Sequence, residues 1–116
     1  MPTEWSDNIV VSELSDEPAL SEELHSIIDR VTSGGKIVSP HVVLNFSQVS
    51  YINSSNLAQL LSLRKAVTER DAQLVLCSVS DSVWSVFQVT RLDNMFRNVP
   101  DPLTALAYLQ IQDEQA

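Results

Sequence analysis

The sequence lacks most of the residues on which disulfides, metal sites and phosphate loops depend. Its 116 residues include one cysteine, Cys77, so no internal disulfide can form. There are only two glycines, and neither a glycine-rich phosphate loop nor a collagen-like repeat is present. The histidines, His25 and His41, have no partner at metal-ligand spacing. We therefore expect no metal site and no cofactor, and we expect a buried, unreactive thiol within the apolar run 74–77.

Long apolar runs are also missing. No stretch approaches the roughly 18 apolar residues that a membrane-spanning helix requires. The first residues, Met-Pro-Thr-Glu-Trp, have neither the basic segment nor the following apolar stretch of a signal peptide. The expected location is therefore the cytoplasm.

Positive charge is scarce. Fifteen acidic residues against seven basic ones give a net charge of −8, and the average surface potential of such a chain repels phosphate backbones and anionic lipids. We expect no nucleic-acid partner and no direct membrane insertion. An acidic balance is common among soluble cytosolic proteins, so it identifies no function by itself.

What the sequence does contain is an alternation of two hydrophobic periods. Four segments predict strands: residues 9–14, the buried-type runs 41–46 and 73–79, and the short edge-type segment 94–99. Four stretches with apolar residues at helical spacing predict helices, namely residues 20–31, 57–67, 83–87 and 103–111. Strand and helix thus alternate, and right-handed crossovers place successive strands side by side. We predict one α/β domain spanning 1–116, with its core at about 8–111 and a small mixed sheet of about four strands.

The segments between these elements contain helix start and stop signals. The glycine pair 34–35 is predicted to end the first helix. The run 53–56, Asn-Ser-Ser-Asn, is suited to capping the second helix. Asp81 or Ser82 is predicted to cap the third, and Asp-Pro at 101–102 to start the last.

Two further expectations concern packing. In the last helix the predicted apolar face consists of Leu103, Leu106, Ala107 and Ile111. Trp5 precedes the first predicted strand, and two interpretations remain open: it covers the edge of the sheet, or it belongs to a disordered end.

The segment 42–57 contains the most informative pattern. It is an apolar strand, a short connector ending in an apolar pair, and then Asn-Ser-Ser-Asn-Leu. This resembles the STAS family pattern, in which the strand is followed by Asp-Ser-Ser/Thr-Gly-Leu. Residues 72–84 resemble the family's next strand and helix start, and 87–96 resemble its helix-to-strand passage, usually written with Thr-Gly-Leu where this chain has Thr-Arg-Leu. The resemblance covers about residues 8–111 and implies a single STAS-like α/β domain.

The resemblance implies a partner-switching regulator. In anti-anti-sigma factors (anti-sigma factor antagonists) of this family, the serine after the Asp is phosphorylated by a serine kinase that is also the anti-sigma factor. The matching position is Ser54. The unphosphorylated form binds the kinase and releases the sigma factor, whereas the phosphorylated form dissociates. The expected partner-binding residues are Asn53, Ser54, Ser55, Asn56, Gln59 and Arg64.

The residues alone leave other interpretations open. The run 53–56 is also what a plain helix cap looks like. Asn53 replaces the family's Asp and Asn56 its Gly, which fits slightly better an alternative function: a constitutive scaffold or accessory subunit of a stressosome-like or lipid-transport assembly, without phosphoregulation. We do not expect an enzyme, because no nucleophile has a base at recognisable spacing.

Overall fold

The structure is a computed structural model that describes residues 3–5, 8–33 and 39–115. Its strands are β1 (Thr3–Trp5), β2 (Ile9–Ser15), β3 (His41–Gln48), β4 (Leu74–Cys77) and β5 (Arg97–Val99). Its helices are α1 (Ala19–Thr32), α2 (Ser54–Thr68), α3 (Asp81–Val89) and α4 (Pro102–Gln115), and a 3₁₀ turn, η2 (Asp93–Met95), precedes β5. The predicted alternation of strands and helices is therefore confirmed from β2 to α4.

The strands form one mixed sheet in the order β1-β2-β3-β4-β5. Strands β2 to β5 are parallel, as successive crossovers through helices require, and only β1 is antiparallel to its neighbour. The sequence predicts about four strands, and β1 is the additional one. Its three residues are too few for a recognisable alternation, and it is held at the edge by pairing with β2, where Trp5 lies opposite Val10.

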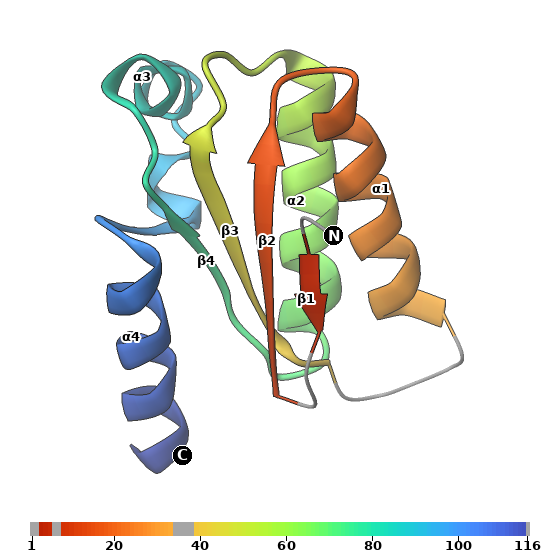
Figure 1. Cartoon of the computed structure of the whole chain (residues 1–116), viewed down its shortest axis with the longest axis vertical. Helices are drawn as coiled ribbons and strands as arrows, with labels where there is room; N and C mark the ends of the chain where they lie inside the picture. Colours follow the sequence, from red (N-terminus) through yellow and green to blue (C-terminus); the bar gives the residue numbers. More distant parts are fainter. Residues whose placement is uncertain (1–2, 6–7, 34–38, 116) are drawn as a thin grey trace.

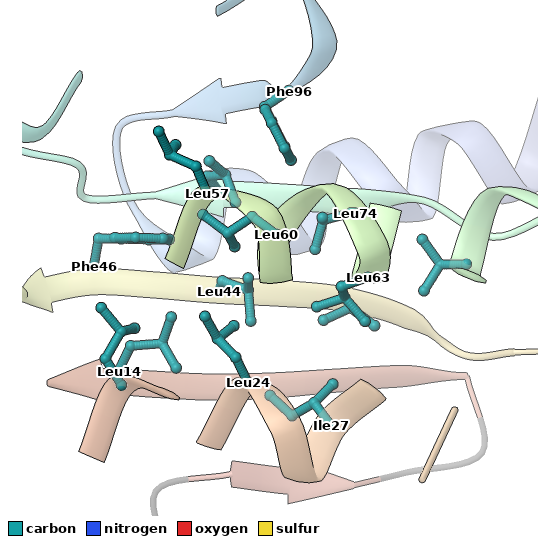
Figure 2. Close-up of a cluster of buried hydrophobic side chains, with 14 of the residues drawn as sticks. Leu14, Leu24, Ile27, Leu44, Phe46, Leu57, Leu60, Leu63, Leu74 and Phe96 are labelled. Atoms are coloured by element: carbon teal, nitrogen blue, oxygen red, sulfur yellow. The ribbon is translucent and has the colours of Figure 1, made fainter. Parts of the chain in front are cut away.

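Helices cover both faces of the sheet (Figure 1). Helices α1 and α2 lie side by side on one face, and α4 lies on the other. The larger core forms between the sheet and α1, α2 and α3, where Leu44, Leu60 and Phe87 are fully buried. Figure 2 shows leucines and phenylalanines of this core, which come from β2, β3, α1 and α2 and point toward one another. This layering fixes the start of α2 at the carboxyl end of β3.

Helix α4 buries a different face from the one predicted. Ala105 and Leu109 are fully buried against β3 and β4, whereas Leu103 is 77% exposed and Ile111 51% exposed. Leu106 is partly buried, and Ala107 is exposed. Apolar residues occur around much of this helix, so periodicity left its rotation undetermined. Contact with the sheet selects the face on which a small residue, Ala105, permits close approach.

Several element boundaries differ from the predictions. Residues 94 and 95 belong to η2, so β5 begins only at Arg97. The cap of α3 is Ser80 and not the predicted Asp81 or Ser82. The Ser80 hydroxyl accepts a hydrogen bond from the Val83 amide at 3.3 Å. Helix α1 ends at Thr32, and the predicted glycine stop at 34–35 lies outside the described residues.

Helices α2 and α3 both end in Schellman motifs built on residues other than glycine. After α3, Arg91 has a φ of 62°, the Leu92 amide bonds the Phe87 carbonyl at 2.7 Å, and the Arg91 amide bonds the Gln88 carbonyl at 3.1 Å. After α2, Asp71 has a φ of 59°. A residue without Cβ adopts this left-handed conformation at no steric cost, and here Asp71 and Arg91 adopt it without being glycine.

Candidate functional site

The start of α2 is fixed by a reciprocal pair of hydrogen bonds. Asn53 is the N-cap residue, and its side-chain oxygen accepts from the Asn56 amide at 2.9 Å. The Asn56 side-chain oxygen accepts in turn from the Asn53 amide at 3.0 Å. This is a capping box in which asparagine takes both roles. The predicted cap at 53–56 is confirmed, and Ser54 is the first residue of the helix.

The surface at this helix terminus is formed by three short polar side chains. Asn53, Ser54 and Ser55 are all exposed. Among the described residues, none forms a hydrogen bond with the hydroxyl of Ser54 or Ser55. The first amides of a helix have no partner inside the helix, and together with the helix dipole they favour negative charge at this end. A group added to Ser54 therefore projects into solvent beside a terminus that tolerates an anion. We call Asn53, Ser54 and Ser55 the Ser54 face.

Asn56 has a different environment from its neighbours. It is fully buried, at 0% exposure, and its side-chain nitrogen donates to Glu17 Oε2 and to Ser21 Oγ, each at 3.3 Å. The expectation that Asn56 contacts a partner does not fit this placement, because its side chain is buried and both of its polar atoms form hydrogen bonds within the protein. Its role in the structure is to connect the start of α2 to the start of α1.

The partly exposed carboxylate of Glu17 completes this connection. Glu17 Oε1 accepts from the Ser21 amide at 2.6 Å, and Glu17 Oε2 accepts from the Ser21 hydroxyl. Hydrogen bonds from Ser21, and to a smaller extent from Asn56 and Asn53, lower the pKa of the Glu17 carboxyl. We call Glu17, Ser21, Asn53 and Asn56 the α1–α2 polar cluster. It ties together two helix starts that are more than thirty residues apart in the sequence.

A second carboxylate holds the connector that precedes Ser54. Asp16 Oδ1 accepts from the Ser50 amide at 2.8 Å, and Asp16 Oδ2 accepts from the Ser50 hydroxyl at 2.6 Å. These bonds lower the pKa of the Asp16 carboxyl. Sequence reasoning missed Asp16, Glu17, Ser21 and Ser50, because no local pattern links residues 34 to 39 positions apart.

Two other predicted site residues point away from the Ser54 face. The Gln59 side-chain nitrogen donates to the Ser21 carbonyl at 3.1 Å, and its side-chain oxygen is buried without a hydrogen-bond partner among the described residues. Arg64 lies ten residues along α2 from Ser54, about 15 Å along the helix axis. Its Nε donates to the Met95 carbonyl at 2.5 Å. The structure therefore brings together Asn53, Ser54 and Ser55, but not Gln59 and Arg64.

The two histidines and the cysteine are the remaining residues that could carry chemistry, and their surroundings indicate structural roles. His41 Nδ1 accepts from the Gln73 amide at 3.0 Å, and His25 is exposed on α1. Cys77 is buried as predicted, and burial raises the pKa of its thiol. In the part of the chain that the structure describes, no three His, Cys, Asp or Glu side chains are grouped so as to hold a metal ion. Among those same residues, no helix has both the length and the apolar character to cross a membrane.

Solved structures with this architecture include regulators and a transporter-related protein. A candidate anti-sigma factor antagonist from Thermotoga maritima matches with 18% identity and a TM-score of 0.78, over 94% of this chain and 93% of that chain. The anti-sigma factor antagonist SpoIIAA in its unphosphorylated form matches with 20% identity and a TM-score of 0.73, over 93% and 94%. The Bacillus cell fate determinant SpoIIAA has also been solved in its phosphorylated form, and matches with 18% identity and a TM-score of 0.66, over 91% and 96%.

A sulfate transporter family protein from Wolinella succinogenes is similar to the same extent, with 17% identity and a TM-score of 0.77, over 94% of this chain and 90% of that chain. At these identities the likeness establishes the fold. The family follows from the sequence itself, because the STAS domain model matches residues 12–105, a segment that contains the whole site around Ser54. The chain belongs to the STAS domain family.

Proposed function

We propose that this chain is an anti-sigma factor antagonist that works by partner switching, with Ser54 as its phosphate acceptor. Unphosphorylated, it binds an anti-sigma serine kinase, and phosphorylation of Ser54 releases it. The observation that carries the proposal is an exposed serine hydroxyl at the first position of α2 in a STAS chain. This function implies a cytoplasmic regulator of transcription with no catalytic activity of its own.

The chemistry of the switch belongs to the kinase. It transfers the γ-phosphoryl group of ATP to Ser54 Oγ, so that a new P–O bond forms, the bond to the β-phosphate breaks, ADP leaves, and the hydroxyl proton passes to a base of the kinase. The product adds about −1.5 to −2 charges at pH 7. The unpaired amides at the start of α2 accommodate this charge, and the α1–α2 polar cluster beneath it is already satisfied internally. Phosphorylation thus leaves the fold intact while changing the surface.

The proposed contact region is the Ser54 face together with Tyr51. Tyr51 is 54% exposed three residues before Ser54, and exposed tyrosines are frequent anchors in protein interfaces. A partner pressed against this region desolvates Ser54, so a phosphate there carries charge into the interface and opposes binding. Gln59 is left out of this region because its side-chain nitrogen donates to the Ser21 carbonyl, and Arg64 because it lies about 15 Å from Ser54 along the helix axis.

Charge substitution at Ser54 tests the switch. Incubation with ATP and the cognate anti-sigma kinase is expected to yield a phosphopeptide containing Ser54, identified by mass spectrometry. Ser54→Ala is expected to capture the kinase from native cells as well as wild type, and Ser54→Asp to lose it. The matched control is Ser62→Asp, which places the same charge on an exposed residue of the same helix, about 12 Å further along its axis.

The alternative is a constitutive scaffold or accessory subunit without phosphoregulation. Two observations favour it: Asn53 removes the negative neighbour that the family places before the serine, and the same fold occurs in a sulfate transporter family protein. A constitutive subunit retains its partner in Ser54→Asp, and kinase treatment leaves Ser54 unmodified. That pair of results would exclude partner switching and support the alternative.

A further inference from the structure

A pocket of about 540 Å³ lies at the amino ends of β4 and β5. Its walls are the last turns of α2, the first residues of β4, the passage from η2 into β5, and Tyr108 of α4. Ser54 follows the carboxyl end of β3, so the pocket is at the opposite end of the parallel strands from the Ser54 face. The volume is within the range of small-molecule sites, about 300–1,000 Å³.

The charge of this pocket is opposite to that of the whole chain. Two arginines, Arg64 and Arg97, line it, and among the residues that the structure describes no Asp or Glu does. The chain as a whole has 15 acidic residues against 7 basic ones. A concave surface with charge of one sign and low-dielectric walls concentrates the electric field and attracts counter-ions. The pocket is therefore suited to an anion despite the net charge of the protein.

Both guanidinium groups are oriented by neutral groups. The Nε of Arg64 donates to the Met95 carbonyl at 2.5 Å, and its four other N–H donors have no partner among the described residues. The Arg97 guanidinium carbon lies 4.7 Å from the centroid of the Tyr108 ring. Neither group contacts a carboxylate among the described residues. Both are thus held in place without being neutralised, as a preorganised oxyanion site requires.

The pocket also has an apolar side. Leu74 and Phe96 lie in its wall and are 7% and 6% exposed, and Figure 2 shows both among the core side chains. Met95, which is 39% exposed, extends this apolar surface toward solvent. An apolar body and an oxyanion on one ligand match the two sides of the pocket.

We propose that this pocket binds a small organic anion, whose phosphate or carboxylate group is held by Arg64 and Arg97 and whose apolar part lies against Met95 and Phe96. The proposal does not depend on the function proposed for Ser54, because the site shares no residue with the Ser54 face. A negative result for one proposal therefore does not contradict the other.

The test is a titration of small-molecule probes into the full chain, monitored by ¹H–¹⁵N NMR. The probes are phenyl phosphate and benzoate, which distinguish the two oxyanions, with inorganic phosphate and the neutral benzyl alcohol for comparison. We expect saturable shifts of the amides of Gln73, Asn94 and Arg97 with phenyl phosphate, with benzoate, or with both. We expect no saturation with benzyl alcohol and weaker binding of inorganic phosphate.

Matched charge variants make the result specific. Arg97→Gln removes a cation from an exposed position in the pocket and is expected to weaken binding by about tenfold, the loss of one charge-assisted contact. Lys65→Gln removes a cation next to Arg64 in sequence but outside the pocket, and should leave affinity within roughly twofold if contact rather than net charge matters. Equal weakening by both variants, equal binding of benzyl alcohol, or no saturable shift at these amides would overturn the proposal.

Discussion

Asn56 illustrates how one substitution in a family pattern is accommodated. The STAS pattern has glycine at this position, and a side chain pointing outward here would obstruct a partner. Asn56 instead points inward, where it completes the capping box and donates to Glu17 and Ser21. Asn53 accepts from the Asn56 amide, as an aspartate also does at an N-cap. The two departures from the pattern therefore act together in one cap and leave Ser54 accessible.

Glu17 makes this arrangement sensitive to acid. Its folded-state pKa is lowered below the ordinary value of 4.5, so its contribution to stability is present above that pH and is lost as pH falls through the folded-state pKa. Glu17→Gln is expected to be less stable than wild type at pH 7, with the difference shrinking below pH 4.5. Urea unfolding across a pH series measures this. Ser21→Ala should show the same trend, and a difference independent of pH would contradict it.

Helix α4 was predicted at the correct place in the sequence, but the face that it buries was predicted incorrectly. Asp101 caps it as expected, with its carboxylate accepting from the Thr104 amide at 2.7 Å. The cap fixes where the helix begins, and the sheet decides which side is buried. Leu103 and Leu109 are therefore chemically identical residues in opposite environments, at 77% and 0% exposure.

This contrast provides a paired measurement. Leu109→Ala is expected to destabilise the fold by about 2–5 kcal/mol, because it removes a fully buried side chain and leaves a cavity. Leu103→Ala is expected to change stability by no more than about 0.5 kcal/mol. Chemical denaturation of both variants measures the two values. A larger loss in Leu103→Ala than in Leu109→Ala would show that α4 packs by the face formed by Leu103 and Ile111.

The molecule as a whole has two proposed sites, at opposite ends of its parallel strands. Parallel strands place all their carboxyl ends at one end of the sheet, where the Ser54 face lies, and all their amino ends at the other, where Arg64 and Arg97 line one pocket. Helix α2 contributes to both, with Ser54 in its first turn and Arg64 in its last two.

This separation predicts that a charge at Ser54 has only local effects. Ser54→Asp is expected to change the free energy of unfolding by less than about 1 kcal/mol, since an anion at a helix start is neutral to favourable. Its NMR shift changes should be confined to the connector and the first turns of α2, and the amides around Arg97 should not move. Shifts at the pocket of the same size as those at Ser55 would show instead that the two ends are coupled.

The sequence by itself determined the order of the elements from β2 to α4, a helix cap within residues 53–56 and the position of Ser54 near the start of that helix. Those features depend on periodicity and on hydrogen bonds between residues three positions apart, so they are visible in short segments. Only the tertiary structure decided that Asn56 turns inward to Glu17, that α4 buries Leu109, and that Arg64 and Arg97 share a pocket. Each of these depends on residues distant in sequence, whose proximity is set by how the sheet and helices pack.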